Sequence, residues 1–400
     1  MTESNDAGTR TPAKEWKRMS FQEAMELERL PDDGSGAQKP VAKFMNRQPP
    51  WLPGAELPWE TIGVSAAKIT RGAFGGVVYA MAPLAAARVV EDEDGESGNH
   101  GKGSKRAIHV SETNYGTGID LEELTCSMRQ SIQAVFTNPG LVDRPFIFNV
   151  SEIHSSRAFS TRLVNVHQST QPSTVPSGPF PNSDATAPPG DSCFSCLVTF
   201  KRPNTGPADV QDSPPQERYH SILSSRPPAE WDLCPQADID ALKEAFPNPG
   251  PGAFPIFDMR KVDMTGYNAD KPVPDRRELI LYRLLEPIPR EDVNAHIACH
   301  AFEADRNGLI MLGNHLGYGY NLGVAATLSY SFYIHVNGEE AVMDGEEWWV
   351  QEVYWPRYSA GRGSMMSLTW SPEGKHVATG YQDGILFPST SMASSREEKL

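Results

Sequence analysis

Apolar and polar residues alternate over several short segments in the second half of the chain, which is the period of a half-buried β-strand. Two such segments, at residues 254–262 and 278–285, come before a long apolar stretch at 293–312 that we interpret as a helix. Four more strands are expected after it, at residues 324–335, 348–354, 364–370 and 376–386.

The first half repeats this order of elements. Residues 61–70 have the pattern of a strand, and residues 74–90 that of a buried helix, rich in alanine and apolar nearly all round. Long β-segments around one buried helix, twice over, indicate an α+β architecture. The absence of β-α-β-α alternation argues against a doubly wound parallel sheet. The remaining strands of this half are expected at residues 131–136, 146–152, 159–166 and 193–200.

A charged frame also occurs twice. Glu152 and Arg162 punctuate an alternating segment in the first half, and Glu352 and Arg362 do so 200 residues later. The repeat suggests two copies of one β-rich unit, with these residues marking the same strands in each. Glu152 and Arg162 lie on neighbouring expected strands and are predicted to pair across them.

Composition divides the chain further. Residues 1–50 lack periodicity and are expected to form a mostly disordered N-terminal tail. The other boundaries are a first unit at 51–202 with loop insertions at 91–118 and 168–190, a proline-rich linker at 203–252, a second unit at 253–390 and a tail at 391–400.

Charge narrows the range of partners and locations. The net charge of −15 gives nucleic-acid binding no global electrostatic support. The longest apolar run, at residues 72–87, is too short to span a bilayer, and no secretory signal is visible. We therefore expect a soluble intracellular protein, cytoplasmic or peroxisomal, since the chain ends Glu-Lys-Leu, a weak form of the peroxisomal Ser-Lys-Leu address. A homo-oligomer is left open.

The cysteines and histidines do not form a metal motif. Cys193 and Cys196 make a lone C-x-x-C without the second pair that a tetrahedral zinc site needs. His296 and His300 have i, i+4 spacing, but the segment is not H-E-x-x-H and no third ligand is evident. A nucleophile elbow of the G-x-S-x-G type is also absent. These residues therefore predict no metal site.

Several short segments, taken in order, resemble the acyl-CoA thioesterase II family. In the first half these are RGAFGG at 71–76, FTNPG at 136–140, VSE at 150–152 and SRAFSTR at 156–162. In the second half they are EADRN at 303–307, ATLSYSFYIH at 326–335 and YQDG at 381–384. Each segment is a weak signal alone, but together they cover most of residues 55–390 in the family's order.

The resemblance implies a tandem double hotdog, in which two antiparallel sheets each curl around a long central helix. It also implies hydrolysis of an acyl-CoA thioester to a free acid and CoA without a cofactor. The family's catalytic trio falls on Asp305 as general base or water orienter, Thr327 as a bridging hydroxyl and Gln382 as the amide that holds the water. Asp383 is expected on the opposite face of the strand from Gln382. Because the matching residues lie only in the second half, we expect one hydrolytic site per chain.

Some assignments stay open at this stage. Gly75 and Gly76 would let backbone approach a substrate closely, or serve close packing of helix on sheet. Pro83 is expected to kink the first helix. Three alternatives to hydrolysis of acyl-CoA remain: a hotdog dehydratase or hydratase, a non-catalytic acyl-thioester-binding protein, and a thioesterase acting on a carrier-protein-bound intermediate.

Overall fold

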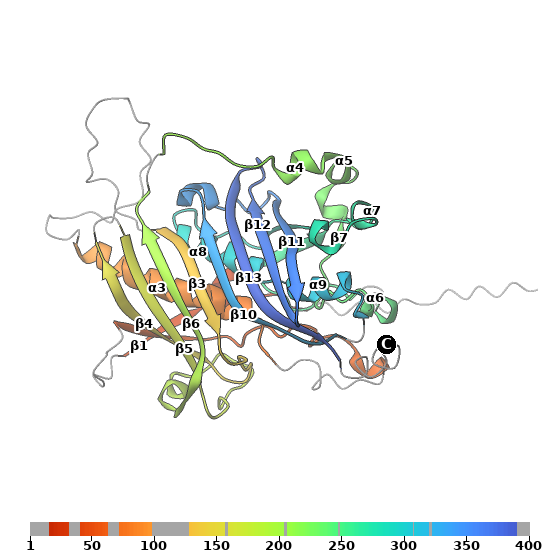
Figure 1. Ribbon diagram of the computed structural model, residues 1–400. Coiled ribbons are helices and arrows are strands. Elements are labelled where there is room, and N and C mark those ends of the chain that lie inside the picture. Colours follow the sequence, from red (N-terminus) through yellow and green to blue (C-terminus); the bar gives the residue numbers. More distant parts are fainter. Residues whose placement is uncertain are drawn as a thin grey trace, which may run out of the picture.

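The computed structural model describes residues 16–31, 41–62, 72–97, 128–156, 159–203, 206–246, 249–306, 308–319 and 322–389. Within them, 13 antiparallel strands form one sheet in the order β1-β2-β4-β5-β6-β3-β10-β13-β12-β11-β9-β8-β7 (Figure 1). The strand bounds are Leu27–Leu30 (β1), Ala42–Asn46 (β2), Met128–Phe136 (β3), Phe146–Ser155 (β4), Phe159–Ser169 (β5), Pro189–Lys201 (β6), Asp232–Leu233 (β7), Phe257–Lys261 (β8), Glu278–Leu284 (β9), Leu322–Ile334 (β10), Trp349–Ser359 (β11), Arg362–Trp370 (β12) and His376–Pro388 (β13).

The strand order is mirrored about the middle of this sheet. There β3 and β10 run antiparallel, with Val135 opposite Ser329 and Ser131 opposite Tyr333. Outward from this seam, β6-β5-β4-β2 follow on one side and β13-β12-β11-β9 on the other. The two halves therefore have corresponding strands, and every strand predicted within the described residues is present.

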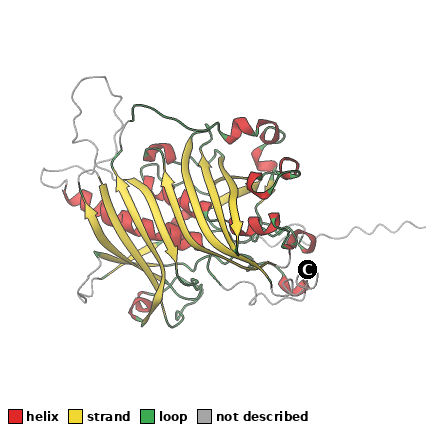
Figure 2. Cartoon of the chain, viewed as in Figure 1, coloured by secondary structure: helices red, strands yellow, loops and turns green. Residues whose placement is uncertain are grey.

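Two long helices cover one face of the sheet (Figure 2). They are α3 (Gly75–Ser97) and α8 (Val293–Ala304). The helices run antiparallel, because Gly76 at the start of α3 lies against Phe302, while Asn294 at the start of α8 donates to Glu91 at 2.7 Å. The shorter helices are α1 (Phe21–Ala24), α4 (Pro215–Arg218), α5 (His220–Leu223), α6 (Leu242–Ala245), α7 (Thr265–Asn268) and α9 (Gly308–His315).

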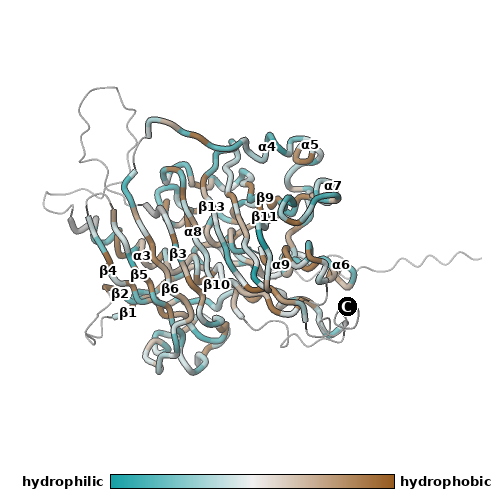
Figure 3. The backbone as a smooth tube through the Cα atoms, viewed as in Figure 1, coloured by the Kyte–Doolittle hydropathy of each residue, from teal (hydrophilic) through white to brown (hydrophobic). Residues whose placement is uncertain are grey.

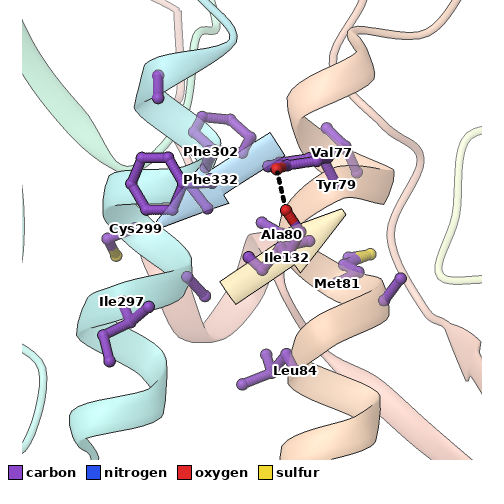
Figure 4. Packing of buried hydrophobic residues seen from close by; sticks show 14 of the residues in the cluster. Val77, Tyr79, Ala80, Met81, Leu84, Ile132, Ile297, Cys299, Phe302 and Phe332 are labelled. Carbon is purple, nitrogen blue, oxygen red and sulfur yellow. Dashed lines mark hydrogen bonds between the residues drawn. The ribbon is translucent and has the colours of Figure 1, made fainter. Parts of the chain in front are cut away.

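The core lies between these helices and the sheet. Figure 4 shows Val77, Tyr79 and Leu84 of α3 in the same buried cluster as Ile297 and Phe302 of α8. Figure 3 shows apolar positions along the strands and helices. Full burial of a large apolar side chain contributes about 1.5–3 kcal/mol relative to exposure, so this layer dominates the stability of the fold. The helix α3 runs unbroken through Pro83. No helix in the described part of the chain is long and apolar enough to cross a membrane.

The expectation of a disordered tail over residues 1–50 is wrong for the part that the structure describes. The short helix α1 begins with a capping box, in which Ser20 and Glu23 exchange side-chain to backbone hydrogen bonds. β1 then pairs with β2, and β2 pairs with β4, so these strands extend the first half of the sheet. A short helix was considered at residues 21–30, and α1 forms its first four residues. Strands β1 and β2 were not predicted, because two short strands show too few alternations to reveal a period.

Other boundaries also need correction. The helix α3 continues to Ser97, so the insertion predicted at 91–118 begins as helix. The expected helix at 293–312 divides into α8 and α9. Most of the strand expected at 61–70, the rest of that insertion and the tail at 391–400 lie outside the described residues.

The linker at 203–252 covers the second face of the sheet in the C-terminal half. Tyr219 and Trp231 pack with Leu279, Leu281 and Val350, which alternate along β9 and β11 with residues of the main core. The carboxylate of Glu352 on β11 is 1% exposed. It accepts hydrogen bonds from the Tyr219 hydroxyl at 2.7 Å and from the guanidinium of Arg218. The linker is therefore a packed part of the domain.

The repeated charged frame has different roles in the two halves. Glu152 lies directly opposite Arg162 and forms an ion pair with it at 3.5 Å, which confirms the predicted cross-strand pair. Glu352 and Arg362 lie on the corresponding strands β11 and β12, but in another register. Arg362 instead forms an ion pair with Asp383.

Replacing Glu352 tests the packing of the linker. The substitution Glu352→Ala leaves Arg218 and the Tyr219 hydroxyl without their shared acceptor. We expect the free energy of unfolding to fall by ~2–4 kcal/mol, because breaking a buried ion pair leaves an uncompensated charge. Urea unfolding measures the loss. Glu346→Ala, at an exposed position, is the control and should change stability by under about 0.5 kcal/mol. Equal stability of the two variants would contradict the packed linker.

Candidate active site

The break between α8 and α9 positions Asp305. This residue caps the C-terminus of α8 with φ −84° and ψ −2°, and it is 8% exposed. The next side chain, Arg306, is buried against the ring of Phe254 at 3.7 Å and donates to the carbonyl of Pro235 at 2.8 Å. At the start of α9, a Cβ on Gly308 would collide with the sulfur of Met365, so the chain needs glycine there.

Two strand residues complete a hydrogen-bonded group with Asp305. The side-chain amide of Gln382 on β13 donates to Asp305 Oδ1 at 2.6 Å and to Thr327 Oγ1 at 2.7 Å. The Thr327 hydroxyl is thereby free to donate its own proton, and it bonds to the Asp305 carboxylate. The three residues predicted from the sequence thus lie within hydrogen-bond reach of one another.

A β-bulge brings Thr327 to the inner face of the sheet. The register of β10 against β13 shifts between Thr327 and Ser329, so Leu328 is an extra residue. Without it, alternation would place Thr327 and the buried Tyr330 on opposite faces. With it, both turn toward the helices. Asp383 lies on the other face, as predicted, and it forms an ion pair with Arg362.

The N-terminus of α3 closes the group from the other half of the chain. The backbone N–H of Gly76 bonds to the Asp305 carboxylate. A Cβ on Gly75 would lie 2.8 Å from Asp305 Oδ2, and one on Gly76 would lie 2.7 Å from the carbonyl oxygen of Phe302. Glycine at both positions is therefore required for the close approach of the two helices, and the positive end of the α3 dipole lies against the carboxylate.

Burial raises the pKa of Asp305 to about 7, since it removes the carboxylate from water. Hydrogen bonds from Thr327, the Gly76 N–H and Gln382 act in the opposite direction and keep the pKa from rising further. A carboxyl group with a pKa near neutrality can accept a proton in one step and lose it in the next.

One acceptor in this group is unused. Gln382 Oε1 is buried and accepts no hydrogen bond from any described residue. An unsatisfied buried amide oxygen costs about 1–3 kcal/mol, unless a small donor such as water occupies the space beside it. Oε1 can therefore accept a hydrogen bond from a water molecule.

The structure adds one neighbour that the sequence did not single out. The ring edge of Phe136 lies 3.2 Å from the position that a Cβ on Gly75 would take, so this half-buried ring borders the carboxylate. Phe136 belongs to the FTNPG segment that carried the resemblance, but an aromatic residue at the end of a strand is ordinary in any core. Only its closeness to Gly75 in the structure shows that Phe136 borders the candidate site.

The histidines and cysteines singled out in the sequence lie elsewhere. His300 bonds to the Tyr282 hydroxyl and to the Ala341 carbonyl, both at 2.8 Å. His296 bonds to the Pro289 carbonyl at 3.2 Å. Among the described residues, no three His, Cys, Asp or Glu side chains gather as metal ligands would. Burial raises the pKa of the Cys193 thiol to about 12, so this sulfur is unreactive.

A large groove lies away from these residues. It has a volume of about 1610 Å³ beside β7 and β8, and none of Asp305, Thr327 and Gln382 lines it. Two of its lysines are paired with carboxylates: Lys261 bonds to Asp238 at 2.8 Å, and Lys243 to Asp240 at 3.1 Å. Its arginines contact other groups: Arg18 donates to the Phe254 carbonyl at 2.7 Å, and Arg226 lies over the Trp231 ring.

Comparison with known proteins identifies the fold. No family model and no curated protein sequence matches the chain. Among solved structures, the acyl-CoA thioesterase II TesB2 from Mycobacterium marinum is similar, with 17% identity over 93% of this chain and 100% of that one and a TM-score of 0.54. A TesB protein from Mycobacterium avium subs paratuberculosis matches at 16% identity over 92% and 98%, with a TM-score of 0.52. At these identities the likeness shows the fold alone, which is a hotdog fold.

The buried carboxyl group predicts a pH-dependent stability difference. The pKa of Asp305 is about 7 when folded against an ordinary 3.8, so the folded chain keeps a proton that the unfolded chain loses. Stability contributed by this group is therefore lost as pH rises from about 4 to 7. The variant Asp305→Asn has no carboxyl group to titrate and does not show this loss. The free energy of unfolding of the variant minus that of the parent should therefore rise by about 2–3 kcal/mol from pH 5 to pH 8. Urea unfolding at both pH values measures this, and a pH-independent difference would contradict a raised pKa.

Proposed function

We propose that the chain is a double hotdog that hydrolyses acyl-CoA thioesters to a free acid and CoA. The first hotdog unit comprises residues up to 202, including β1 and β2, and the second comprises 253–390. The mirrored strand order and the antiparallel pair α3 and α8 support this division. The observation that carries the activity is a near-neutral carboxyl group at Asp305, held by an amide whose oxygen remains free.

The chemistry requires little from the protein. A thioester carbonyl is electrophilic and a thiolate leaves readily, so the site must mainly hold a water molecule and take its proton. Gln382 Oε1 accepts one O–H of the water and the Asp305 carboxylate accepts the other. The water oxygen bonds to the carbonyl carbon, the C–S bond breaks, and the proton on Asp305 passes to the departing sulfur.

The oxyanion formed in this step needs donors. The first N–H groups of a helix have no intrahelical acceptor, and those of α3 lie beside the Asp305 carboxylate. Gly75 is the nearest of them after Gly76, whose N–H bonds to Asp305. We assign the Gly75 N–H to the oxyanion and Gly76 to positioning the base. Thr327 fixes the orientation of both Gln382 and Asp305.

Among the described residues of the first half, strand β6 carries no counterpart of the Gln382 amide. Strand β6 corresponds to β13 in the mirrored sheet, but its inward side chains are apolar or thiol: Phe194, Cys196, Val198 and Phe200. None can hold a water as the Gln382 amide can. One hydrolytic site per chain follows, with the first half contributing the start of α3.

Hydrolysis is favoured over hydration by the placement of the histidines. A hotdog dehydratase or hydratase is expected to combine a histidine with a carboxylate. Here His296 and His300 are bonded to other partners, and no histidine of the described chain bonds to the trio. Incubation with an enoyl-CoA separates the two reactions, because hydration leaves the thioester intact.

Release of free thiol from acyl-CoA substrates of several chain lengths tests the assignment. We expect Asp305→Asn and Gln382→Ala to lower kcat by roughly 10²–10⁴-fold, the usual contribution of a positioned general base. Asp383→Asn is the matched control, since this neighbour faces the other side of the sheet, and it should stay within about twofold. Full activity of Asp305→Asn would rule out this site.

The pH profile of the reaction gives a second test. Hydrolysis needs Asp305 in its ionised form, and its pKa is about 7. The rate should therefore increase with pH, reach half of its maximum near pH 7 and level off above it. A rate that is already maximal at pH 5 would contradict Asp305 as the base.

A further inference from the structure

Strand β10 is paired unequally on its two sides. It pairs with β13 from Leu322 to Ile334, but with β3 only from Ser329 to Tyr333. β3 ends at Phe136, after which the backbone N–H of Thr137 bonds to the carbonyl of Cys193 and the chain turns away. On this side of β10, residues 323–327 have no strand partner among the described residues.

The backbone groups on this edge can be assigned. A Cβ on Gly384 would lie 2.6 Å from the carbonyl oxygen of Ala326, so Ala326 faces β13. A second observation agrees. The N–H of Leu386 bonds to the carbonyl of Gly361, on the side of β13 away from β10. The backbone groups of the preceding residue, Ile385, therefore face β10, where its partner is Ala326. Because backbone groups of a strand alternate in direction, those of Ala325 and Thr327 face the unpaired edge.

The edge is open and continuous with the proposed active site. Residues 323–326 are all exposed, and three of them are glycine or alanine, so little side chain obstructs the backbone. At its inner end, Thr327 bonds to Gln382, and Gln382 to Asp305. If the thioester lies at Asp305, an extended substrate chain attached to its sulfur would run along this edge. The first groups that it meets would be backbone donors and acceptors.

We propose that residues 323–327 of β10 bind the pantetheine arm of the substrate by strand addition. This inference rests on the proposed hydrolysis. The arm is an extended chain with two amide groups adjacent to the sulfur, and amides are the groups that an unpaired strand edge recognises. Ala325 and Thr327 each present one N–H and one C=O. Such recognition needs no cation, in keeping with the net charge of −15.

The inference is tested first with the unmodified protein and a series of acyl thioesters. An acyl-pantetheine has both amides, an acyl-N-acetylcysteamine has one, and an acyl-ethanethiol has none. Each amide removed should lower kcat/KM by about 2- to 13-fold, the range of one net hydrogen bond. Equal kcat/KM across the series would overturn the strand edge while leaving hydrolysis intact. No hydrolysis of any thioester, including acyl-CoA, would instead refute the proposed function.

Two proline variants locate the contact. Ala325→Pro removes an N–H from the free edge, where proline is tolerated, whereas Ala326→Pro removes one from the ladder to β13. We expect Ala325→Pro to lower kcat/KM for acyl-pantetheine by a larger factor than for acyl-ethanethiol. The control, Ala326→Pro, should instead lower the Tm. Equal losses with both substrates for Ala325→Pro would place the arm elsewhere, and the substrate series remains decisive should that variant not fold.

CoA and carrier proteins share this arm, so further substrates distinguish the two sources. Acyl-CoA and an acyl-carrier protein are compared with acyl-pantetheine, using the parent and Ala325→Pro. The proposal predicts a similar fold-loss from the substitution with all three, because the arm is common to them. A higher kcat/KM for one carrier identifies the source that the rest of the surface favours. A loss confined to one carrier would contradict recognition of the shared arm.

Discussion

The close approach of the start of α3 to the end of α8 is the contact on which the rest of the structure depends. It brings a carboxylate from one half of the chain to the backbone N–H groups of the other, and glycine at 75 and 76 is the condition for it. Burial at this contact raises the pKa of Asp305, while the Gly76 N–H and the helix dipole limit the rise. The same contact therefore joins the halves and adjusts the proton affinity of the site.

The two halves share an arrangement of strands but differ in what they bury. The first half encloses the apolar helix α3 and inward side chains of β6 that carry no amide. The second half buries Glu303, Asp305, Gln351 and Gln382, and covers its outer face with the linker. Buried polar groups cost stability unless they are bonded, so the second half depends more than the first on hydrogen bonds within its interior.

Most of the strands and the three polar residues of the candidate site were accessible from the sequence, because alternation is a local signal and Asp305, Thr327 and Gln382 fall in segments that resemble a family. Other features depend on distant contacts. The bulge at Leu328 and the break after Ala304 follow from packing against β13 and Met365, which leave no local pattern. Strands β1 and β2 are too short to show a period. The charged frame 200 residues apart was locally convincing, yet the register differs between the halves, and register is set by pairing across the sheet.

The central claim is that Asp305 is a buried carboxyl group that ionises near neutrality and acts as the base. Infrared difference spectroscopy of the carboxyl stretch, comparing the parent with Asp305→Asn across a pH series, isolates this one group. The account predicts a band that titrates with a midpoint near pH 7, at the same pH as the half-maximal rate of thiol release. A midpoint near pH 4, or one that differs from the midpoint of the rate, would contradict it.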